Sequence, residues 1–409
     1  MSIQYIYIVG KPDTHFELLE SIHSMGFRAG VLIDSELTLV QPERYDRVER
    51  VNFSNIDSEL VRLDGLDLSM SGVICTYENY IIAKSKIGNF FNVPAPSLLS
   101  AQLTTDKALM RKAFLEADRT ISPEYSAVDT VEQAISFANR YGYPLILKPT
   151  NLVKSLLVLK CDSEQQLRDS FFFASTTVGK LCEKYHIHDR APQLIIEEFI
   201  VGEQYSIAAF VDDEGTPHFC DGIVKLKNAQ DIGVDDNYLY SRTLPTTLPD
   251  DIVRQMYSVA EKGVRALSMK STPAHIELMS GPSGIKIIEI GARVGGYRPR
   301  MYAYSYNIDL TEQEIRLALG EKPILKGTFS TYCAVYELFP QKEGAFDKII
   351  GDISPEKLTY YRITAEPGDR IGPAKNGFKA TAIIIVTHNN KQQFDDLCRS
   401  IDSLRVEVR

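Results

Sequence analysis

Residues 275–293 read HIELMSGPSGIKIIEIGAR. The centre, Gly281-Pro-Ser-Gly284, carries turn residues between two apolar runs rich in isoleucine, a pattern that predicts a β-hairpin. Glu277 and Glu289 stand at equal distance from the midpoint of that turn. Because side chains alternate between the two faces of a strand, we expect the two glutamates to be cross-strand neighbours on one face.

Two carboxylates placed opposite each other repel unless something neutralises them. A divalent cation does so, and magnesium typically takes one or two carboxylates together with phosphate oxygens of a substrate. Arg293 follows two residues after a glycine and is placed to reach the same phosphates. The alternative is an exposed hairpin with ordinary solvated glutamates.

Length and composition indicate a globular protein of two to three domains, with 409 residues, 44% apolar and 24% charged. A net charge of -9 argues against a nucleic-acid or anionic-membrane partner. The six cysteines are scattered without C-x-x-C spacing, which favours reduced, buried thiols and a cytoplasmic location. The first apolar run has no basic segment before it and is too short to span a bilayer, so we expect neither a leader nor a membrane helix.

The N-terminal region alternates between strand and helix patterns. A strand at 3–9, a helix at 14–25 and a strand at 29–33 predict a βαβ unit and hence a parallel sheet. A later strand, 72–75, places Glu78 just past its carboxyl end, where open α/β sheets bind ligands. An acidic residue in the first turn of a helix is the other interpretation of Glu78.

The rest of the chain predicts a second α+β region and a third segment. Prolines in Val93-Pro-Ala-Pro96 mark the first boundary, and Thr104-Thr-Asp-Lys107 opens a helix capped by Thr or Asp. Further elements are expected as strands at 143–149, 156–159, 193–199, 205–211 and 219–224, and as helices from 162 and at 251–267. From about 311 a short helix precedes β-like runs, including 332–338 and 380–387.

Two more stretches carry candidate chemistry. Lys148 ends an apolar strand, where a buried lysine is uncommon and a phosphate partner explains it; an exposed strand end is the alternative. Residues 194–206, LIIEEFIVGEQYS, read as a strand that turns at Gly202. Backbone groups of such a linker fit an adenine edge and nearby polar side chains fit a ribose, whereas an ordinary hairpin with solvated acids is the alternative.

In their order along the chain, these pieces resemble the ATP-grasp superfamily. Lys107 comes first, then Lys148, the Glu-Glu-Phe-Ile linker, the AHIEL strand and finally IIEIGARVGG. The last two motifs look most like the carboxylate–amine ligases, which include L-amino-acid ligases and relatives of biotin carboxylase and carbamoyl-phosphate synthase. The resemblance implies an N-terminal Rossmann-like domain (1–95), an ATP-grasp domain of two α+β subdomains (96–310; about 104–190 and 191–310) and a C-terminal mixed, β-rich α+β domain (311–409).

The resemblance also implies a role for each matching residue. ATP and Mg²⁺ or Mn²⁺ would be the cofactors, with Glu277 and Glu289 as metal ligands and Arg293 and Lys148 as catalytic residues. The residues expected to bind ATP are Lys107, Lys148, Lys154, Glu197, Glu198, Phe199, Ile200, Glu203, Gln204 and His275. The residues expected to contact substrate are Glu78, Arg293, Gly295, Gly296 and Arg298.

The implied activity is an ATP-dependent ligase. It would activate a small carboxylate as an acyl phosphate, join it to an amine such as an amino acid, and release ADP and phosphate. Bicarbonate activation like that of biotin carboxylase is one alternative, and an ATP-binding module without turnover is another. The sequence does not determine the oligomeric state; a homodimer is one possibility, since dimers are the commonest oligomers.

Three positions depart from the family pattern. The segment 150–156 has no glycine where most members carry a glycine- and serine-rich phosphate loop, although Lys154 supplies a charge there. Gly291 stands where an asparagine metal ligand is usual, and we expect a water to fill that coordination position. Gln204 aligns with the usual ribose-binding glutamate, while Glu203 stands one position earlier.

Overall fold

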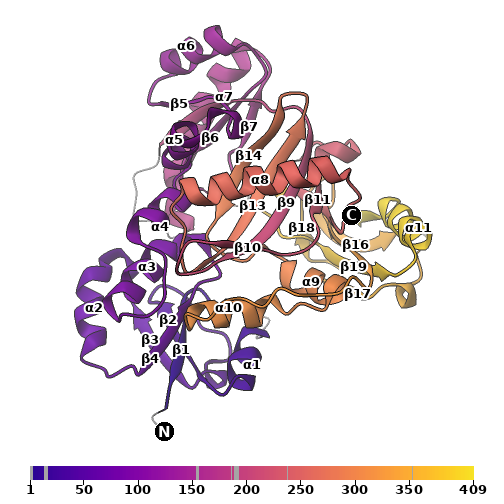
Figure 1. Cartoon of the computed structure of the whole chain (residues 1–409). Coiled ribbons are helices and arrows are strands. Elements are labelled where there is room, and N and C mark those ends of the chain that lie inside the picture. The colour runs from indigo at the N-terminus through magenta and orange to yellow at the C-terminus, as the bar shows by residue number, and fades with distance from the viewer. Residues whose placement is uncertain are drawn as a thin grey trace.

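The computed structural model describes residues 3–12, 17–152, 156–185, 187, 193–236, 238–351 and 353–409. It contains a parallel sheet at the N-terminus, a small antiparallel sheet, and a large antiparallel sheet that runs through the centre of the molecule (Figure 1). The mixed α/β and α+β class expected from the sequence is confirmed.

The N-terminal sheet has the strand order β3-β2-β1-β4, and its pairings are parallel. Its strands are β1 (Tyr5–Gly10), β2 (Arg28–Asp34), β3 (Arg47–Val51) and β4 (Met70–Ile74), and its helices are α1 (Glu17–Ser24), α2 (Ile56–Asp64) and α3 (Ile81–Phe90). β1 and β2 are buried almost throughout, as parallel strands covered on both faces require. The predicted βαβ unit is therefore correct. The first residues of the predicted helix, 14–16, lie outside the described residues.

A second unit holds a small sheet of order β5-β8-β6-β7, shown at the top of Figure 1. Its elements are α4 (Leu98–Thr105), α5 (Lys107–Ala117), β5 (Tyr125–Val128), α6 (Val131–Tyr141), β6 (Leu145–Pro149), β7 (Leu159–Cys161), α7 (Glu164–Lys184) and β8 (Leu194–Glu198). Asp106 caps α5 by accepting hydrogen bonds from the backbone of Ala108 and Leu109. The predicted strand at 156–159 was wrong for its first residues, because Leu157 adopts a left-handed backbone (φ 56°) in a turn.

The central sheet has the order β14-β13-β9-β11-β12-β15-β19-β17, with β10 also paired to β9. Its first elements are β9 (Glu203–Val211), β10 (Pro217–Phe219), β11 (Val224–Asn228), β12 (Leu239–Leu244), α8 (Asp250–Ala266), β13 (Thr272–Gly281) and β14 (Gly284–Gly291). The predicted strand at 219–224 was wrong. Phe219 ends one strand and Val224 begins the next, with Gly222 at a positive φ of 82° between them.

The C-terminal residues extend that sheet. β15, β19 and β17 continue it beyond β12, and β16, β18 and β20 form a separate small sheet. The elements are α9 (Arg298–Tyr306), α10 (Leu310–Ala318), β15 (Tyr332–Leu338), β16 (Gly344–Ile350), β17 (Tyr360–Ile363), β18 (Arg370–Ile371), β19 (Ala382–His388), α11 (Lys391–Asp402) and β20 (Arg405–Val408). α10 packs back against β4 and α1 of the N-terminal unit.

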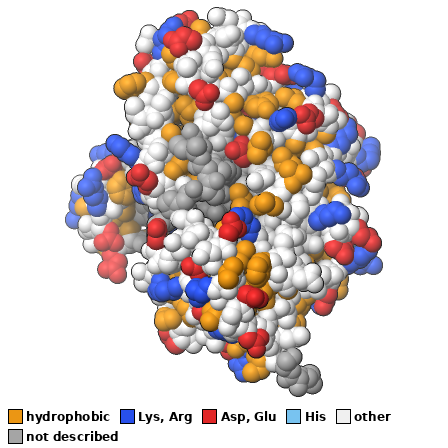
Figure 2. Space-filling model, turned by 90° about the vertical axis from the view of Figure 1, so that its left-hand side faces the viewer, with side chains coloured by type: hydrophobic (Ala, Val, Ile, Leu, Met, Phe, Trp, Pro, Cys, Tyr) orange, Lys and Arg blue, Asp and Glu red, His pale blue; other side chains and the backbone are white. Residues whose placement is uncertain are grey.

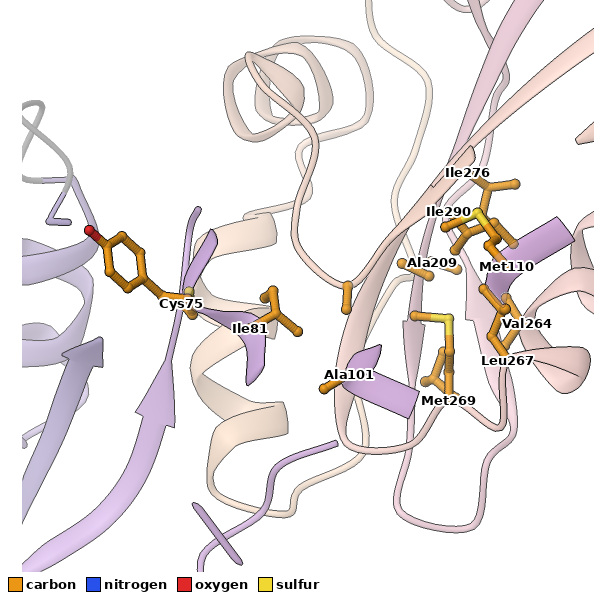
Figure 3. Packing of buried hydrophobic residues seen from close by; sticks show 14 of the residues in the cluster. Cys75, Ile81, Ala101, Met110, Ala209, Val264, Leu267, Met269, Ile276 and Ile290 are labelled. Carbon is orange, nitrogen blue, oxygen red and sulfur yellow. The ribbon is translucent and has the colours of Figure 1, made fainter. Parts of the chain in front are cut away.

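One hydrophobic cluster joins the N-terminal sheet to the central hairpin. It contains Cys75 and Ile81 on one side and Ile276 and Ile290 on the other (Figure 3). Met110 of α5 belongs to the same cluster and lies beside the two isoleucines in Figure 3. Ile276 and Ile290 are paired across the hairpin and fully buried, so the neighbouring residues in each strand face the opposite side.

The distribution of charged side chains on the surface agrees with the net negative charge of the sequence. Acidic and basic side chains are interspersed on the face shown in Figure 2 rather than gathered into one basic patch. Among the described residues, no helix is both long and apolar enough to cross a membrane.

Candidate active site

The hairpin brings its two glutamates together as the sequence predicts. Glu277 of β13 is the register partner of Glu289 of β14, and a bulge follows Glu277. Because Ile276 and Ile290 turn into the core, both carboxylates leave the sheet on the other face. Neither side chain is fully covered, with about a quarter of each exposed (22% and 27%).

Glu277 is held as an anion. Its Oε2 accepts a hydrogen bond from Gln204 Nε2 at 3.0 Å, and its Oε1 lies 3.2 Å from His275 Nε2. Burial raises the pKa of this carboxyl, but the His275 hydrogen bond and the charges of Arg298 and Arg293 outweigh it and bring the pKa to about 2. Burial lowers the pKa of His275 itself, and its buried Nδ1 has no hydrogen-bond partner.

Glu289 faces the first of the two predicted phosphate lysines. Lys107 Nζ lies 3.3 Å from Glu289 Oε1 and donates a 2.9 Å hydrogen bond to the carbonyl of Leu152. The backbone N–H of Lys107 donates to the carbonyl of Thr150 at 2.9 Å. The chain after β6 is thereby fixed over the start of α5, and a small pocket opens between this segment and the hairpin. The pocket is lined by Glu78, Asn79, Thr104, Thr105, Lys107, Asn151, Leu152 and Glu289.

Lys148 belongs to a buried group of three charges. Its Nζ lies 2.7 Å from Glu197 Oε2, and Arg111 Nε donates to Glu197 Oε1 at 2.8 Å. Arg111 also donates to the carbonyl of Ile288 at 2.6 Å, which ties α5 to the hairpin. Burial raises the pKa of Glu197, but its two cationic partners lower the pKa by more than burial raises it. The acid therefore stays ionised. Both oxygens of Glu197 thus have partners within the protein.

The linker after β8 positions the remaining predicted nucleotide residues. Glu198 accepts a hydrogen bond from the backbone of Glu124 at 2.9 Å, and Ile200 is buried. The ring of Phe199 lies 5.0 Å from Lys160 Nζ. Glu203 is exposed and pairs with Lys225, whereas Gln204 points to the hairpin and bridges Glu277 and Asn228. Lys154 lies outside the described residues.

Arg293 pairs with Glu78 across the boundary between the N-terminal unit and the central sheet. Arg293 Nη2 lies 3.0 Å from Glu78 Oε1. A Cβ added at Gly291 would stand only 2.6 Å from the same oxygen, so the glycine leaves the space that Glu78 fills. Burial raises the pKa of Glu78, and so do the charges of Glu289 and Glu277, while Arg293 opposes them.

Gly295, Gly296 and Arg298 lie at the start of α9. A Cβ on Gly295 would stand 2.5 Å from His275 Nδ1, so this position admits only glycine without displacing the imidazole. Gly296 is exposed. Arg298 is 2% exposed and donates to Ser206 Oγ at 2.8 Å and to the carbonyl of Gly296 at 3.2 Å. Burial lowers the pKa of Arg298 to about 10.

Sequence reasoning missed Arg111 and Ser206. Arg111 lies on the face of α5 that packs against the hairpin, at four residues from Lys107. That helical spacing was a usable signal, because residues four apart share a face. Ser206 carried no signal of its own, since its contact with Arg298 joins residues far apart in sequence.

The two hairpin carboxylates fit a magnesium ion whose remaining ligands come from a nucleotide and from water. Within the described ranges, no three His, Cys, Asp or Glu side chains gather closely enough to hold a metal ion unaided. Glu277 and Glu289 supply two carboxylates, and magnesium accepts phosphate oxygens and waters for its other positions.

Comparison with known proteins identifies the fold and one domain of the chain. The family described as the ATP-grasp domain matches residues 141–299. The L-amino acid ligase from Bacillus licheniformis has a similar structure, with a TM-score of 0.80, 18% identity and 99% of each chain covered. N5-carboxyaminoimidazole synthetase from Staphylococcus aureus, complexed with ADP, gives a TM-score of 0.73 at 13% identity, covering 98% of this chain and 97% of that one.

Residues 141–299 therefore match the ATP-grasp domain, as the resemblance predicts, and the two structural neighbours share the fold of the chain. Among curated sequences, it is 27% identical over 317 residues to the uncharacterised protein y4rH of Sinorhizobium fredii. That match covers 76% of this chain and 62% of y4rH, so the chain spans less than two thirds of this relative.

Proposed function

We propose that the protein is an ATP-dependent ligase that joins a small carboxylate to an amine and releases ADP and phosphate. The observation that carries the proposal is the ionised Glu277 in register with Glu289, with Lys107 beside the second acid. This arrangement suits a metal-bridged triphosphate, because it offers two anionic oxygen donors and a cation next to them.

The nucleotide would lie between the small sheet and the hairpin. Lys148 and Lys107 would contact phosphates, with Lys107 exchanging the Leu152 carbonyl for a phosphate oxygen. Glu197, Glu198, Phe199 and Ile200 of the linker would border the adenine, and Gln204 or Glu203 would bind the ribose. Lys154 is a further proposed phosphate contact. Glu277 and Glu289, with His275 behind Glu277, would hold Mg²⁺ or Mn²⁺, which neutralises charge on the phosphates.

Two balanced steps make up the reaction. A carboxylate oxygen attacks the γ-phosphorus, and the bond from that phosphorus to the ADP oxygen breaks. The amine nitrogen then attacks the acyl carbon, the bond from that carbon to the phosphate oxygen breaks, and the nitrogen loses a proton. Arg293 would stabilise the negative charge of the tetrahedral intermediate. Glu78, Gly295, Gly296 and Arg298 would border the substrates, with Glu78 orienting Arg293.

The test is ADP and phosphate release by the purified protein with ATP, MgCl₂ and a mixture of amino acids. Release that needs both an added acid and an added amine, and that Glu289→Gln removes, is the expected result. Bicarbonate-dependent release without an amine would replace this proposal with biotin carboxylase-like chemistry. Tight ATP binding with no release under any of these conditions would replace it with a binding module.

The substrate class, the cellular location and the oligomeric state are proposed together with this activity. Small-molecule substrates, a cytoplasmic location and a homodimer fit the enzyme proposed here. The six cysteines are free and five are buried, which supports a reducing compartment. Size-exclusion chromatography with light scattering tests the dimer.

A further inference from the structure

Two buried cations share one buried carboxylate. Lys148 of β6 is 5% exposed, Glu197 of β8 is 4% exposed, and Arg111 of α5 is fully buried. Lys148 Nζ lies 2.7 Å from Glu197 Oε2, and Arg111 Nε donates to Glu197 Oε1 at 2.8 Å. A longer bond runs from Arg111 Nη2 to Glu197 Oε2 at 3.4 Å. With all three groups ionised, this cluster carries one positive charge in excess.

The excess positive charge is not balanced by the protein itself. Within the described part of the chain, neither cation has a second carboxylate at ion-pair distance. Arg111 Nη1 is buried and has no hydrogen-bond partner. Burial lowers the pKa of Lys148, Glu197 raises it, and the charge of Arg111 lowers it again. The two cations therefore compete for one acid, and an added anion would relieve that competition.

Stability alone does not account for two cations on one acid. A single cation would neutralise Glu197, and each further buried charge adds a desolvation penalty. Apolar residues of similar volume often replace buried charges without loss of stability. The second cation therefore indicates a role beyond holding the fold.

The cluster lies against the hairpin that carries the two opposed acids. Arg111 Nη2 donates to the carbonyl of Ile288 at 2.6 Å, and Ile288 directly precedes Glu289. Four residues before Arg111 and on the same face of α5, Lys107 reaches Glu289 with its Nζ at 3.3 Å from Oε1. Lys107 and Glu289 both line the pocket beside the segment that follows β6. An anion bound there would lie on the side of α5 that carries the excess charge.

We propose that Arg111 is a positioning residue, which pairs with Glu197 and so leaves the charge of Lys148 available to a phosphate group of the nucleotide. The inference rests on the proposed ligase function and adds a residue to the same site. Without Arg111, Lys148 and Glu197 would form a neutral pair, and a phosphate would have to compete with the carboxylate for the lysine. Arg111 acts through Glu197 and does not itself contact the nucleotide.

The affinity for a non-hydrolysable ATP analogue tests this role, measured by isothermal calorimetry on the full-length protein with MgCl₂. Arg111→Met makes the cluster neutral and should raise the Kd by about tenfold or more. Arg111→Lys keeps a cation beside Glu197, so its Kd should stay within about threefold of the wild type. The matched control is Lys112→Met, which removes an exposed charge paired with Glu116 from the next position of α5 and should leave the Kd unchanged.

A double variant separates charge balance from packing. Arg111→Met combined with Glu197→Gln restores one excess positive charge, now on Lys148 alone. Its Kd should therefore be at least about threefold lower than that of Arg111→Met. A purely structural role of Arg111 predicts the opposite order, because the double variant loses further contacts. Urea unfolding of each variant with the analogue bound establishes that folded proteins are compared.

Three results would overturn the inference. They are an equal Kd for the wild type and Arg111→Met, equal weakening by Arg111→Lys and Arg111→Met, and a double variant that binds no more tightly than Arg111→Met. If the double variant does not unfold cooperatively, the first two comparisons decide. Each of these results leaves the ligase proposal intact, because the wild type still binds the analogue. If the wild type itself does not bind the analogue, the proposed function is lost whatever the variants do.

Discussion

The molecule contains two carboxylate groupings built on opposite principles. Glu197 contacts two cations, Lys148 and Arg111, and is almost fully buried. Glu277 and Glu289 oppose each other on the hairpin, partly exposed, with Lys107 beside only the second. In the first grouping both oxygens of the acid are paired with cations of the protein, whereas the second places two carboxylates opposite each other. We infer that the paired acid stabilises the fold, whereas the opposed acids of the hairpin are the proposed cation ligands.

The largest expected effect is on the hairpin. Glu289→Gln should lower turnover by roughly 10³-fold, because it removes a proposed metal ligand and no core volume. Its unfolding free energy, measured in urea, should stay near that of the wild type or rise, since the repulsion from Glu277 is relieved. A loss of cooperative unfolding would give Glu289 a structural role and remove the contrast.

Substitution of the buried Glu197 should lower the free energy of unfolding. Glu197→Gln leaves Lys148 and Arg111 buried without a countercharge, which should destabilise the protein by about 3 kcal/mol. Urea unfolding at pH 7 measures the change. Wild-type stability in this variant would show that Glu197 is not needed for the fold and would make the two groupings alike.

A smaller effect is expected at the lysine that joins this grouping to the nucleotide. Lys148→Met should raise the Kd of ATP by about tenfold, equivalent to about 1.4 kcal/mol, while Glu197 keeps Arg111 as its partner. Calorimetric titration with an ATP analogue measures it. Exposed Lys112→Met is the control, since Lys112 pairs with Glu116 on the solvent-facing side of α5. Equal Kd values in the wild type and Lys148→Met would confine Lys148 to the fold.

The smallest effect is on pH-dependent stability at Glu314. Its folded pKa of about 7 lies above the ordinary 4.5, because burial outweighs the charges of Lys84 and Arg293. Folding therefore favours the protonated acid. The stability of the wild type relative to Glu314→Gln is fully present below pH 4.5 and is lost as the pH rises through about 7. We expect a change on the order of 1 kcal/mol between pH 5 and pH 8, measured by urea unfolding of both proteins. A pH-independent difference would contradict this environment.

Local patterns predicted most of the elements near the site. The Gly-Pro-Ser-Gly turn marked the hairpin, but it pairs Gly281 with Gly284, a register that alone would place Glu277 opposite Ile288. The bulge after Glu277 shifts the register by one residue and brings Glu277 opposite Glu289. The error at 219–224 arose because Asp221-Gly222 lies inside an apolar run, and a turn dipeptide was outweighed by its neighbours.

Contacts between distant segments were beyond reach of the sequence. Arg111 and Glu197 are 86 positions apart, and the space left by Gly291 has meaning only once Glu78 is seen to fill it. Such coincidences are set by topology, and a single sequence does not encode them locally.

The hydrogen bond from Lys107 to the Leu152 carbonyl has a consequence for selectivity among anions. A lone sulfate or inorganic phosphate must displace a main-chain oxygen that is already in place, and it brings few other contacts to offset that loss. In the proposed complex, a triphosphate would make the same exchange while also reaching Lys148 and the two hairpin acids. If Lys107 binds nucleotide as proposed, this contact would favour a triphosphate over single phosphate or sulfate ions at this lysine.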